Sequence, residues 1–177
     1  MMIEQKHIFL IDDDDSVRNA ISRVLTEYGY LVEEFSKPKI FLEKFNPKSP
    51  SVILLDMQMP EMNGVELQHQ LITRGITTPI IFISGNSHPK QIVQGLKSGA
   101  VDFIFKPFET EDLLVVIEKS IKIDRDLYQK FHKTRIYKEY LDSLSSREKE
   151  VSQFLVTGLM NIQIAQLLGI SESLLIN

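Results

Sequence analysis

Four consecutive aspartates, Asp12–Asp15, follow the apolar run Ile8–Ile11 near the start of this 177-residue chain. Clustered carboxylates repel one another, so a fold tolerates them where a cation or a lysine neutralises the group. A hard divalent ion such as Mg²⁺ suits such a cluster, because it prefers a few oxygen ligands and completes its octahedron with water. The cluster therefore predicts a cation site.

Three other reactive side chains, Asp56, Ser84 and Lys106, also follow short apolar runs. Taken singly, each has a simple explanation, since aspartate and serine cap helices and a lysine after a strand usually faces water. Together with the aspartates, they form a set that can hold a phosphoryl group. Metal and ammonium would neutralise its oxygens, the hydroxyl would hydrogen-bond one of them, and an aspartate would be the acceptor.

The elements that would position these side chains follow from the hydrophobic pattern. Five apolar runs of strand length alternate with stretches of helical spacing, and Gly or Pro stands at the joints. The runs are His7–Ile11, Leu31–Phe35, Val52–Leu55, Ile80–Ile83 and Val101–Phe105. This order predicts an α/β fold, a flavodoxin-like doubly wound five-stranded parallel sheet with helices on both faces. Such sheets bind ligands outside the carboxyl ends of their strands, where the reactive side chains stand.

The chain from Glu109 to about Leu144 contains neither proline nor glycine, which predicts one long helix. Seven of ten positions at alternating three- and four-residue steps along it are apolar, which is compatible with a partner helix. A helix that lies on its own domain and continues as a linker explains the pattern equally well. The last segment, 145–177, has its own helical periodicity, with Gly158 and Gly169 as stops.

The composition, with 43% hydrophobic residues and a net charge of −4, is that of a globular protein. The absence of cysteine excludes disulfides, thiolate nucleophiles and zinc–thiolate sites. No early apolar run is long enough for a signal peptide or a membrane span, so we expect a cytoplasmic protein without a membrane partner. Neither residues 1–120 nor residues 121–177 are basic enough to indicate nucleic-acid binding from charge alone.

The stretches FLIDDDDSVR, VILLDMQMPEMNGVEL, IIFISG and GAVDFIFKPF resemble the receiver domain of two-component response regulators. The resemblance implies that a sensor histidine kinase is a partner and that Asp56 is the phosphoacceptor. It also implies a Mg²⁺ cofactor. The metal ligands would be Asp12, Asp13, Asp56 and the backbone carbonyl of Gln58. The chain would not be an enzyme beyond self-phosphorylation from small donors and autodephosphorylation.

The same resemblance implies how phosphorylation would be sensed. Ser84 and Lys106 match the hydroxyl and the lysine that detect the phosphoryl group, and Phe103 matches the aromatic switch position. Their movement would remodel the 88–105 face and favour a homodimer, formed through that face, the long helix or both.

Two features near the site have simpler expected roles. Asp14 and Asp15 are not ligands in the family pattern, and either can cap the helix that follows them. Asn63-Gly64 is expected to be a turn or a helix start, and Lys106–Pro107 resembles the cis bond of the family.

The stretch LSSREKEVSQFLVTGLMNIQIAQLLGISES, Leu144 to Ser173, resembles the LuxR-type helix-turn-helix module of the NarL/FixJ family. A helix is expected to begin at Ser145 or Ser146, a second to span Asn161–Leu168, and a turn to follow at Gly169-Ile170-Ser171. The resemblance predicts a receiver at 4–120, a helical linker at 121–143 and a partial output domain at 144–177.

The family pattern implies DNA as a partner and transcription as the regulated process. It continues after Ser173 through a recognition helix and a fourth helix, whereas four residues remain here, so the DNA-binding residues are unknown. Two functions therefore stay open. One is a DNA-binding transcription regulator, and the other is a DNA-independent signalling receiver whose output module acts through protein contacts.

A haloacid-dehalogenase-like phosphatase is the alternative from another class. Asp12 and Asp14 match its D-x-D pattern, and its later serine and lysine would be Ser84 and Lys106. This scheme gives Asp56 no role, and the acidic pair that should follow the lysine strand is missing. The response-regulator interpretation is therefore preferred.

Overall fold

The computed structural model describes residues 5–48, 50–85, 89–155 and 159–169. The chain forms two compact units, Met1–Gln129 and Lys130–Asn177. Helix α5 (Thr110–Ser143) contributes to both units and confirms the long helix expected from the sequence. Among the helices of the described residues, none has the length and apolar character needed to cross a membrane.

Five parallel strands form one sheet in the order β2-β1-β3-β4-β5. They are β1 (His7–Ile11), β2 (Leu31–Phe35), β3 (Ser51–Asp56), β4 (Ile80–Ser84) and β5 (Asp102–Phe105). Every residue of β3 and β4 is buried, as expected for the central strands of a covered sheet. The strand order reverses between β1 and β3, so their carboxyl ends flank the switch point where sheets of this kind bind ligands.

The strand limits differ from the expected ones by one residue at four ends. Strand β3 begins at Ser51 and ends at Asp56, β4 extends to Ser84, and β5 begins at Asp102. A hydrophobic pattern marks apolar residues and not the ladder itself, so it stops short of the polar residues that continue β3 and β4 and includes Val101, which lies before β5. Because Asp56 and Ser84 are paired with the neighbouring strand, the sheet fixes their backbones.

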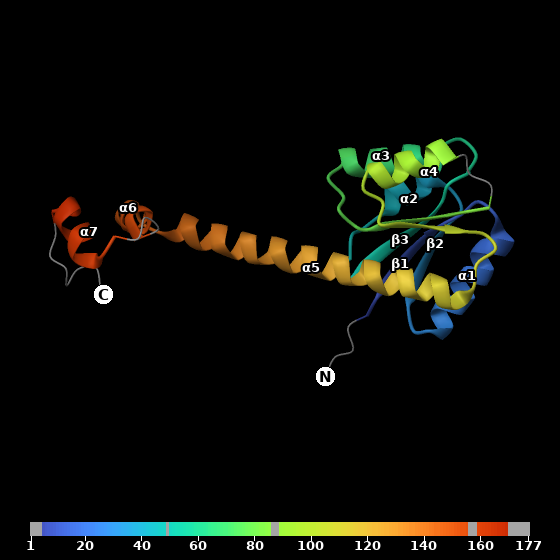
Figure 1. Ribbon diagram of the computed structural model, residues 1–177, viewed down its shortest axis with the longest axis horizontal. Helices are drawn as coiled ribbons and strands as arrows, with labels where there is room; N and C mark the ends of the chain where they lie inside the picture. The colour runs from blue at the N-terminus through green and yellow to red at the C-terminus, as the bar shows by residue number, and fades with distance from the viewer. Residues whose placement is uncertain (1–4, 49, 86–88, 156–158, 170–177) are drawn as a thin grey trace. The chain divides into compact units, whose positions relative to one another are not determined.

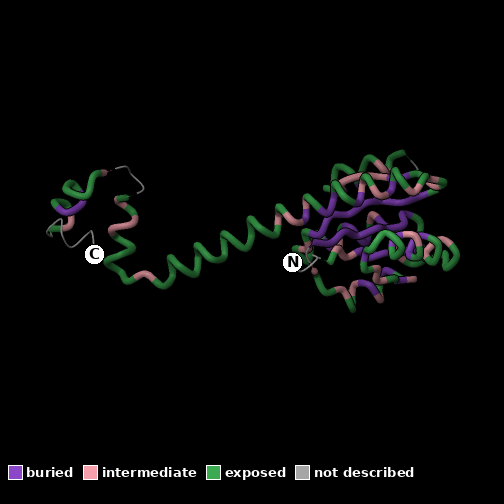
Figure 2. Tube along the Cα trace, turned by 90° about the horizontal axis from the view of Figure 1, so that it is seen from below, coloured by how far each residue is buried: buried purple, intermediate pink, exposed green. Residues whose placement is uncertain are grey.

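Helices cover both faces of the sheet, as Figure 1 shows. In addition to α5, they are α1 (Asp15–Glu27), α2 (Pro38–Lys44), α3 (Gly64–Thr73) and α4 (Pro89–Lys97). Alternate residues of a strand point to opposite faces. Leu10 therefore joins the core under α1 and α5, and Phe9 joins the core under α2, α3 and α4. In Figure 2 the strands form the buried layer between the more exposed helices.

Two glycines allow a helix to approach the sheet closely. A Cβ atom on Gly95 of α4 would lie 2.6 Å from a ring carbon of Phe82 on β4. A Cβ atom on Gly64, the first residue of α3, would lie 2.6 Å from the backbone oxygen of Asp56. Non-bonded carbon atoms prefer about 3.5–4.0 Å, so larger side chains would push these helices away from the sheet.

In the second unit, α6 (Ser146–Leu155) begins where the sequence predicts a helix start. The backbone N–H of Ser145 donates to Oε2 of Glu148 at 2.7 Å, and the backbone N–H of Glu148 donates to Oγ of Ser145 at 3.3 Å. These reciprocal bonds satisfy two amides that the first turn of a helix leaves unpaired.

Helix α7 (Asn161–Leu168) has the limits expected from the sequence, and it ends at Gly169 in the left-handed conformation with φ of 64°. The guanidinium of Arg147 in α6 donates to the carbonyl oxygen of Leu168 at 2.7 Å, which ties the two helices together. Ile170 and Ser171 of the expected turn, and the expected stop at Gly158, lie outside the described residues.

Candidate functional site

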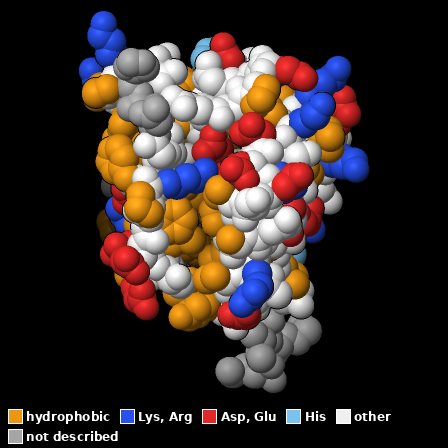
Figure 3. Space-filling view, turned by 90° about the vertical axis from the view of Figure 1, so that its right-hand side faces the viewer, with side chains coloured by type: hydrophobic (Ala, Val, Ile, Leu, Met, Phe, Trp, Pro, Cys, Tyr) orange, Lys and Arg blue, Asp and Glu red, His pale blue; other side chains and the backbone are white. Residues whose placement is uncertain are grey.

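The carboxyl ends of β1, β3 and β5 bring together Asp12, Asp56 and Lys106. The ammonium of Lys106 donates to Oδ2 of Asp12 at 2.7 Å and to Oδ1 of Asp56 at 2.8 Å. Asp12 is 2% exposed and Asp56 is 7% exposed. Figure 3 views this edge of the sheet and shows acidic side chains gathered on it. Three predicted site residues thus form one ion-paired group.

A backbone amide holds the second oxygen of each carboxylate. The N–H of Asp14 donates to Oδ1 of Asp12 at 2.9 Å, and the N–H of Gln58 donates to Oδ2 of Asp56 at 2.7 Å. Both bonds reach two residues along the chain, as in the turns that aspartate side chains form with their own backbone. Each carboxylate is therefore oriented by its own loop and by the shared ammonium.

Burial raises the pKa of the Asp56 carboxyl above its ordinary value, and the bonds from Lys106 and Gln58 offset this only in part. For Lys106, burial lowers the pKa, but hydrogen bonds to Asp12 and Asp56 outweigh it and hold the pKa above its ordinary value. Lys106 is therefore an ammonium at neutral pH. One positive charge faces two buried carboxylates, so the site can accept further positive charge.

Asp13, the remaining carboxylate among the expected metal ligands, is exposed, whereas Asp12 is buried. Among the described residues, no three acidic, histidine or cysteine side chains lie close enough to form a ready metal centre. The available donors are carboxylate and carbonyl oxygens, which are the ligands that Mg²⁺ prefers. The chemistry of the donor set thus fits Mg²⁺, although the structure brings together only two of the three carboxylates.

The expected sensing residues lie beside this group. Ser84 ends β4 and is 1% exposed, and its carbonyl oxygen accepts the backbone N–H of Lys106 at 2.9 Å. Phe103 of β5 is half-buried, and its ring centroid lies 4.7 Å from that of Phe105 in an edge-to-face arrangement. Phe105 is 61% exposed, so the pair connects the core under α4 with the surface of β5.

The local backbone follows the expectations from the sequence. Asp14 caps α1 by accepting the N–H of Ser16 at 2.8 Å. Asn63 caps α3, so Asn63-Gly64 is a helix start. The Lys106–Pro107 bond is cis, as in the family pattern.

Sequence reasoning missed Arg18. Its side chain, 12% exposed, donates to the backbone oxygen of Asp12 at 2.8 Å and pairs with the carboxylates of Asp15 and Glu34. The only available signal was a cation one helical turn after an acidic cluster. That signal usually means a solvated salt bridge on a helix surface.

Comparisons with known proteins point to one family. Residues 8–118 match the response regulator receiver domain, and residues 142–173 match the bacterial regulatory proteins of the luxR family. The chain is 39% identical over 166 residues to the response regulator protein TodT of Pseudomonas putida, covering 94% of this chain and 73% of that protein. It is 31% identical to the transcriptional regulatory protein FixJ of Bradyrhizobium diazoefficiens, covering 96% and 83%.

Two solved structures are similar over most of the chain. A low-resolution structure of the response regulator StyR has a TM-score of 0.86 and 37% identity, and covers 96% of this chain and 86% of that one. A crystal structure of full-length FixJ from B. japonicum has a TM-score of 0.65 and 31% identity, and covers 94% and 82%.

Proposed function

The chain belongs to the response regulators, with a receiver domain and a LuxR-type output module, and from this premise we propose that a sensor histidine kinase phosphorylates it on Asp56. The observation that carries this proposal is the shared ammonium of Lys106, which lies 2.8 Å from Asp56 and 2.7 Å from Asp12. The proposal includes a receiver at 4–120, a linker at 121–143 and an output domain at 144–177.

In the proposed reaction, a carboxylate oxygen of Asp56 attacks the phosphorus of a phosphohistidine on the kinase. The phosphorus–nitrogen bond breaks as the new phosphorus–oxygen bond forms, and the leaving imidazole takes a proton from solvent. Lys106 is already in place to pair with the added oxygens. Small phosphodonors would react in the same way. The chain would therefore be a phosphoacceptor, with no enzymatic activity beyond self-phosphorylation from such donors and autodephosphorylation.

The proposed cofactor is Mg²⁺, held by Asp12, Asp13, Asp56 and the backbone carbonyl of Gln58. When bound, the ion supplies positive charge for the phosphoryl oxygens. The geometry supports this role, because the buried carboxylates of Asp12 and Asp56 share one ammonium and gain from a second cation.

The site assignment is tested by labelling with acetyl phosphate and Mg²⁺, followed by intact mass. Asp56→Asn should abolish the added phosphoryl mass, and Asp13→Asn should raise the Mg²⁺ concentration that labelling requires. Asp126→Asn is the matched control, because Asp126 is an exposed aspartate on α5 and should label normally. Normal labelling of the Asp56→Asn protein would refute the assignment.

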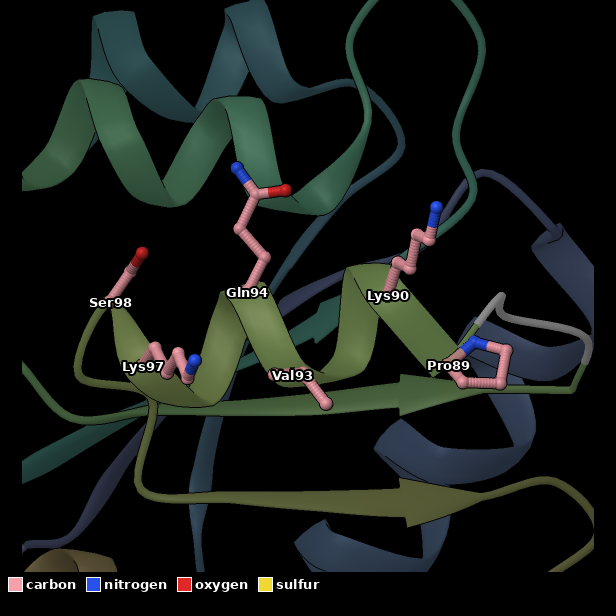
Figure 4. A pocket seen from close by; sticks show the side chains of 6 residues that line it. All are labelled: Pro89, Lys90, Val93, Gln94, Lys97 and Ser98. Atoms are coloured by element: carbon pink, nitrogen blue, oxygen red, sulfur yellow. The ribbon is translucent and has the colours of Figure 1, made fainter.

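The proposed output of phosphorylation is a homodimer through the 88–105 face, of which residues 89–105 are described. Helix α4 exposes Val93 by 50% and Leu96 by 41% on this face, and β5 exposes Phe105. Figure 4 shows five residues of α4 and Ser98, which directly follows it, around a shallow hollow of about 490 Å³. They are Pro89, Lys90, Val93, Gln94, Lys97 and Ser98. A second copy would cover the exposed apolar side chains.

The long helix offers a second surface for the same homodimer. Every residue of α5 from 130 to 143 is exposed, and among them Phe131, Tyr137 and Tyr140 are each more than half exposed. Sedimentation velocity with and without beryllofluoride tests both routes. Val93→Glu should weaken a dimer formed through α4, and Tyr137→Glu should weaken one formed through α5. A dimerisation constant unaffected by beryllofluoride would refute this output.

For the output module, the match of residues 142–173 to the luxR family supports DNA binding and transcription regulation. One observation favours a DNA-independent role. The two cations of α6 are engaged within the protein. Arg147 binds Glu150 on the same helix and the carbonyl oxygen of Leu168 on α7, each at 2.7 Å, and Lys149 donates to the backbone oxygen of Asp142 at 3.4 Å. A salt-dependent gel shift, comparing this chain with one that carries a complete four-helix module, separates the two functions.

A further inference from the structure

Arg18 makes contacts with three parts of the receiver. One terminal nitrogen donates to the backbone oxygen of Asp12 at 2.8 Å, at the end of β1. The other pairs with the carboxylate of Asp15 in the first turn of α1. The Nε atom lies 3.6 Å from Oε2 of Glu34 on β2. All three sides of one guanidinium are therefore engaged by the protein.

Glu34, the partner of Arg18 on β2, is itself held in place. Oε1 of Glu34 accepts the hydroxyl of Ser22 at 2.6 Å, and Ser22 is buried on the next turn of α1. The side chain of Arg18 is only 12% exposed, whereas those of Asp15 and Glu34 are 77% and 35% exposed, so the guanidinium is shielded from water and its carboxylate partners are not. The charge-assisted hydrogen bond from this shielded guanidinium to the carbonyl of Asp12 is therefore stronger than an exposed one.

Arg18 acts next to the proposed metal site, because it binds the backbone oxygen of Asp12. The carbonyl of Asp12 belongs to the peptide that joins Asp12 to Asp13, the two acidic residues next to each other in the proposed metal site. Fixing that carbonyl fixes the plane of the peptide. It therefore limits the directions in which the two side chains can leave the backbone.

We propose that Arg18 is a positioning residue for the metal site, which holds the Asp12–Asp13 peptide in the orientation that Mg²⁺ binding requires. The inference rests on the proposed function, because it assumes that Asp12 and Asp13 bind the ion. A lysine at this position is a poor substitute, because one ammonium cannot reproduce a planar fork that reaches three acceptors.

The experiment compares Mg²⁺ affinity in the full chain with Arg18→Met, Arg18→Lys and Arg23→Met. Arg23 is the matched control, because it lies on the same helix, carries the same charge and pairs with Glu27 in an exposed contact. Titration with Mg²⁺ alone, followed by the NMR shifts of the Asp14 and Gln58 amides, gives the dissociation constant without any phosphodonor. Thermal unfolding of each variant reports its stability separately.

Loss of a group that orients a metal ligand typically weakens binding about 10–100-fold. We expect Arg18→Met to raise the Mg²⁺ dissociation constant at least about 10-fold, Arg18→Lys to give an intermediate value, and Arg23→Met to match the wild type. At saturating Mg²⁺, labelling by acetyl phosphate should return to the wild-type rate, since the defect lies in affinity. A purely structural role would lower the melting temperature and leave the dissociation constant unchanged.

A dissociation constant for Arg18→Met within about twofold of that for Arg23→Met overturns the inference alone, because the loss of a residue that orients metal ligands should weaken binding more than this. Absence of Mg²⁺ binding by the wild type overturns the proposed metal site, and the inference with it. If Arg18→Met does not fold, Arg18→Lys, which keeps the charge but loses the planar fork, takes its place. A dissociation constant for this variant within about twofold of that for Arg23→Met would again overturn the inference.

Discussion

Replacing Gly95 with alanine should destabilise the receiver, although alanine is the better helix former. The added Cβ would lie 2.6, 3.1 and 3.3 Å from three ring carbons of Phe82. Since carbon atoms prefer at least about 3.5 Å, α4 or the ring would have to move by about 1 Å. Phe82 is fully buried on β4, so the ring has little room to move.

Three effects determine how much unfolding free energy the Gly95→Ala protein loses. Overpacking a filled core costs about 1–3 kcal/mol, and the higher helix propensity of alanine returns about 1 kcal/mol. A shift of α4 would also stretch the bond from Nε2 of Gln68 to the carbonyl of Gly95, now 2.9 Å, at a cost of about 1 kcal/mol. The expected loss is therefore about 1–3 kcal/mol of unfolding free energy.

Urea unfolding followed by circular dichroism measures this loss. Phe82→Leu removes the ring atoms that clash. The double variant should therefore lose less unfolding free energy than the two single variants lose together, by a coupling energy of about 0.5–3 kcal/mol. Gly85→Ala is a control without a clash, because its Cβ would lie 3.7 Å from the Cβ of Lys106. Gly95→Ala protein that is as stable as the wild type, or more stable, would refute the packing argument.

Two other changes test contacts of α5 with the sheet and with residues that directly precede its strands. Asp124→Ala should cost about 1–3 kcal/mol of unfolding free energy, because Oδ2 of Asp124 accepts the buried N–H of Ser51 at 2.9 Å; Asp124→Asn, which keeps an acceptor, should cost less. Burial raises the pKa of Glu118, but hydrogen bonds from Lys6 and Tyr30 outweigh it, so the net pKa is lowered. The stabilisation is present above the ordinary pKa of a glutamate and is lost as pH falls through the lowered value. Glu118→Gln should therefore flatten the acid limb of stability, by only about 0.2–1 kcal/mol because the pair is half exposed; an unchanged acid limb would contradict this.

The sequence was sufficient to predict the sheet and the convergence of Asp12, Asp56 and Lys106. Hydrophobic spacing places the five strands to within one residue at each end, and parallel strands place their carboxyl ends on one edge. The cap at Asp14 could also be predicted, because capping depends on neighbours within one turn of helix.

Features that depend on tertiary contacts were not predictable in the same way. The role of Arg18 requires Glu34 of β2 to lie beside α1, and the need for glycine at position 95 requires Phe82 to face α4. The spacing of residues along the chain does not reveal that Glu34 lies beside α1 or that Phe82 faces α4. The exposed position of Asp13 depends likewise on the local turn and not on its residue type.

The contact between Lys106 and the two aspartates has a consequence for how the protein is made. Asp12 and Asp56 belong to the first and third strands, whereas Lys106 follows the fifth strand and reaches the ribosome's exit last among them. A nascent chain that stops before β5 would hold the acidic pair without its ammonium. The ion-paired group of Asp12, Asp56 and Lys106 is thus assembled only in a receiver whose final strand has been synthesised and docked, so the proposed phosphorylation would require a completed sheet.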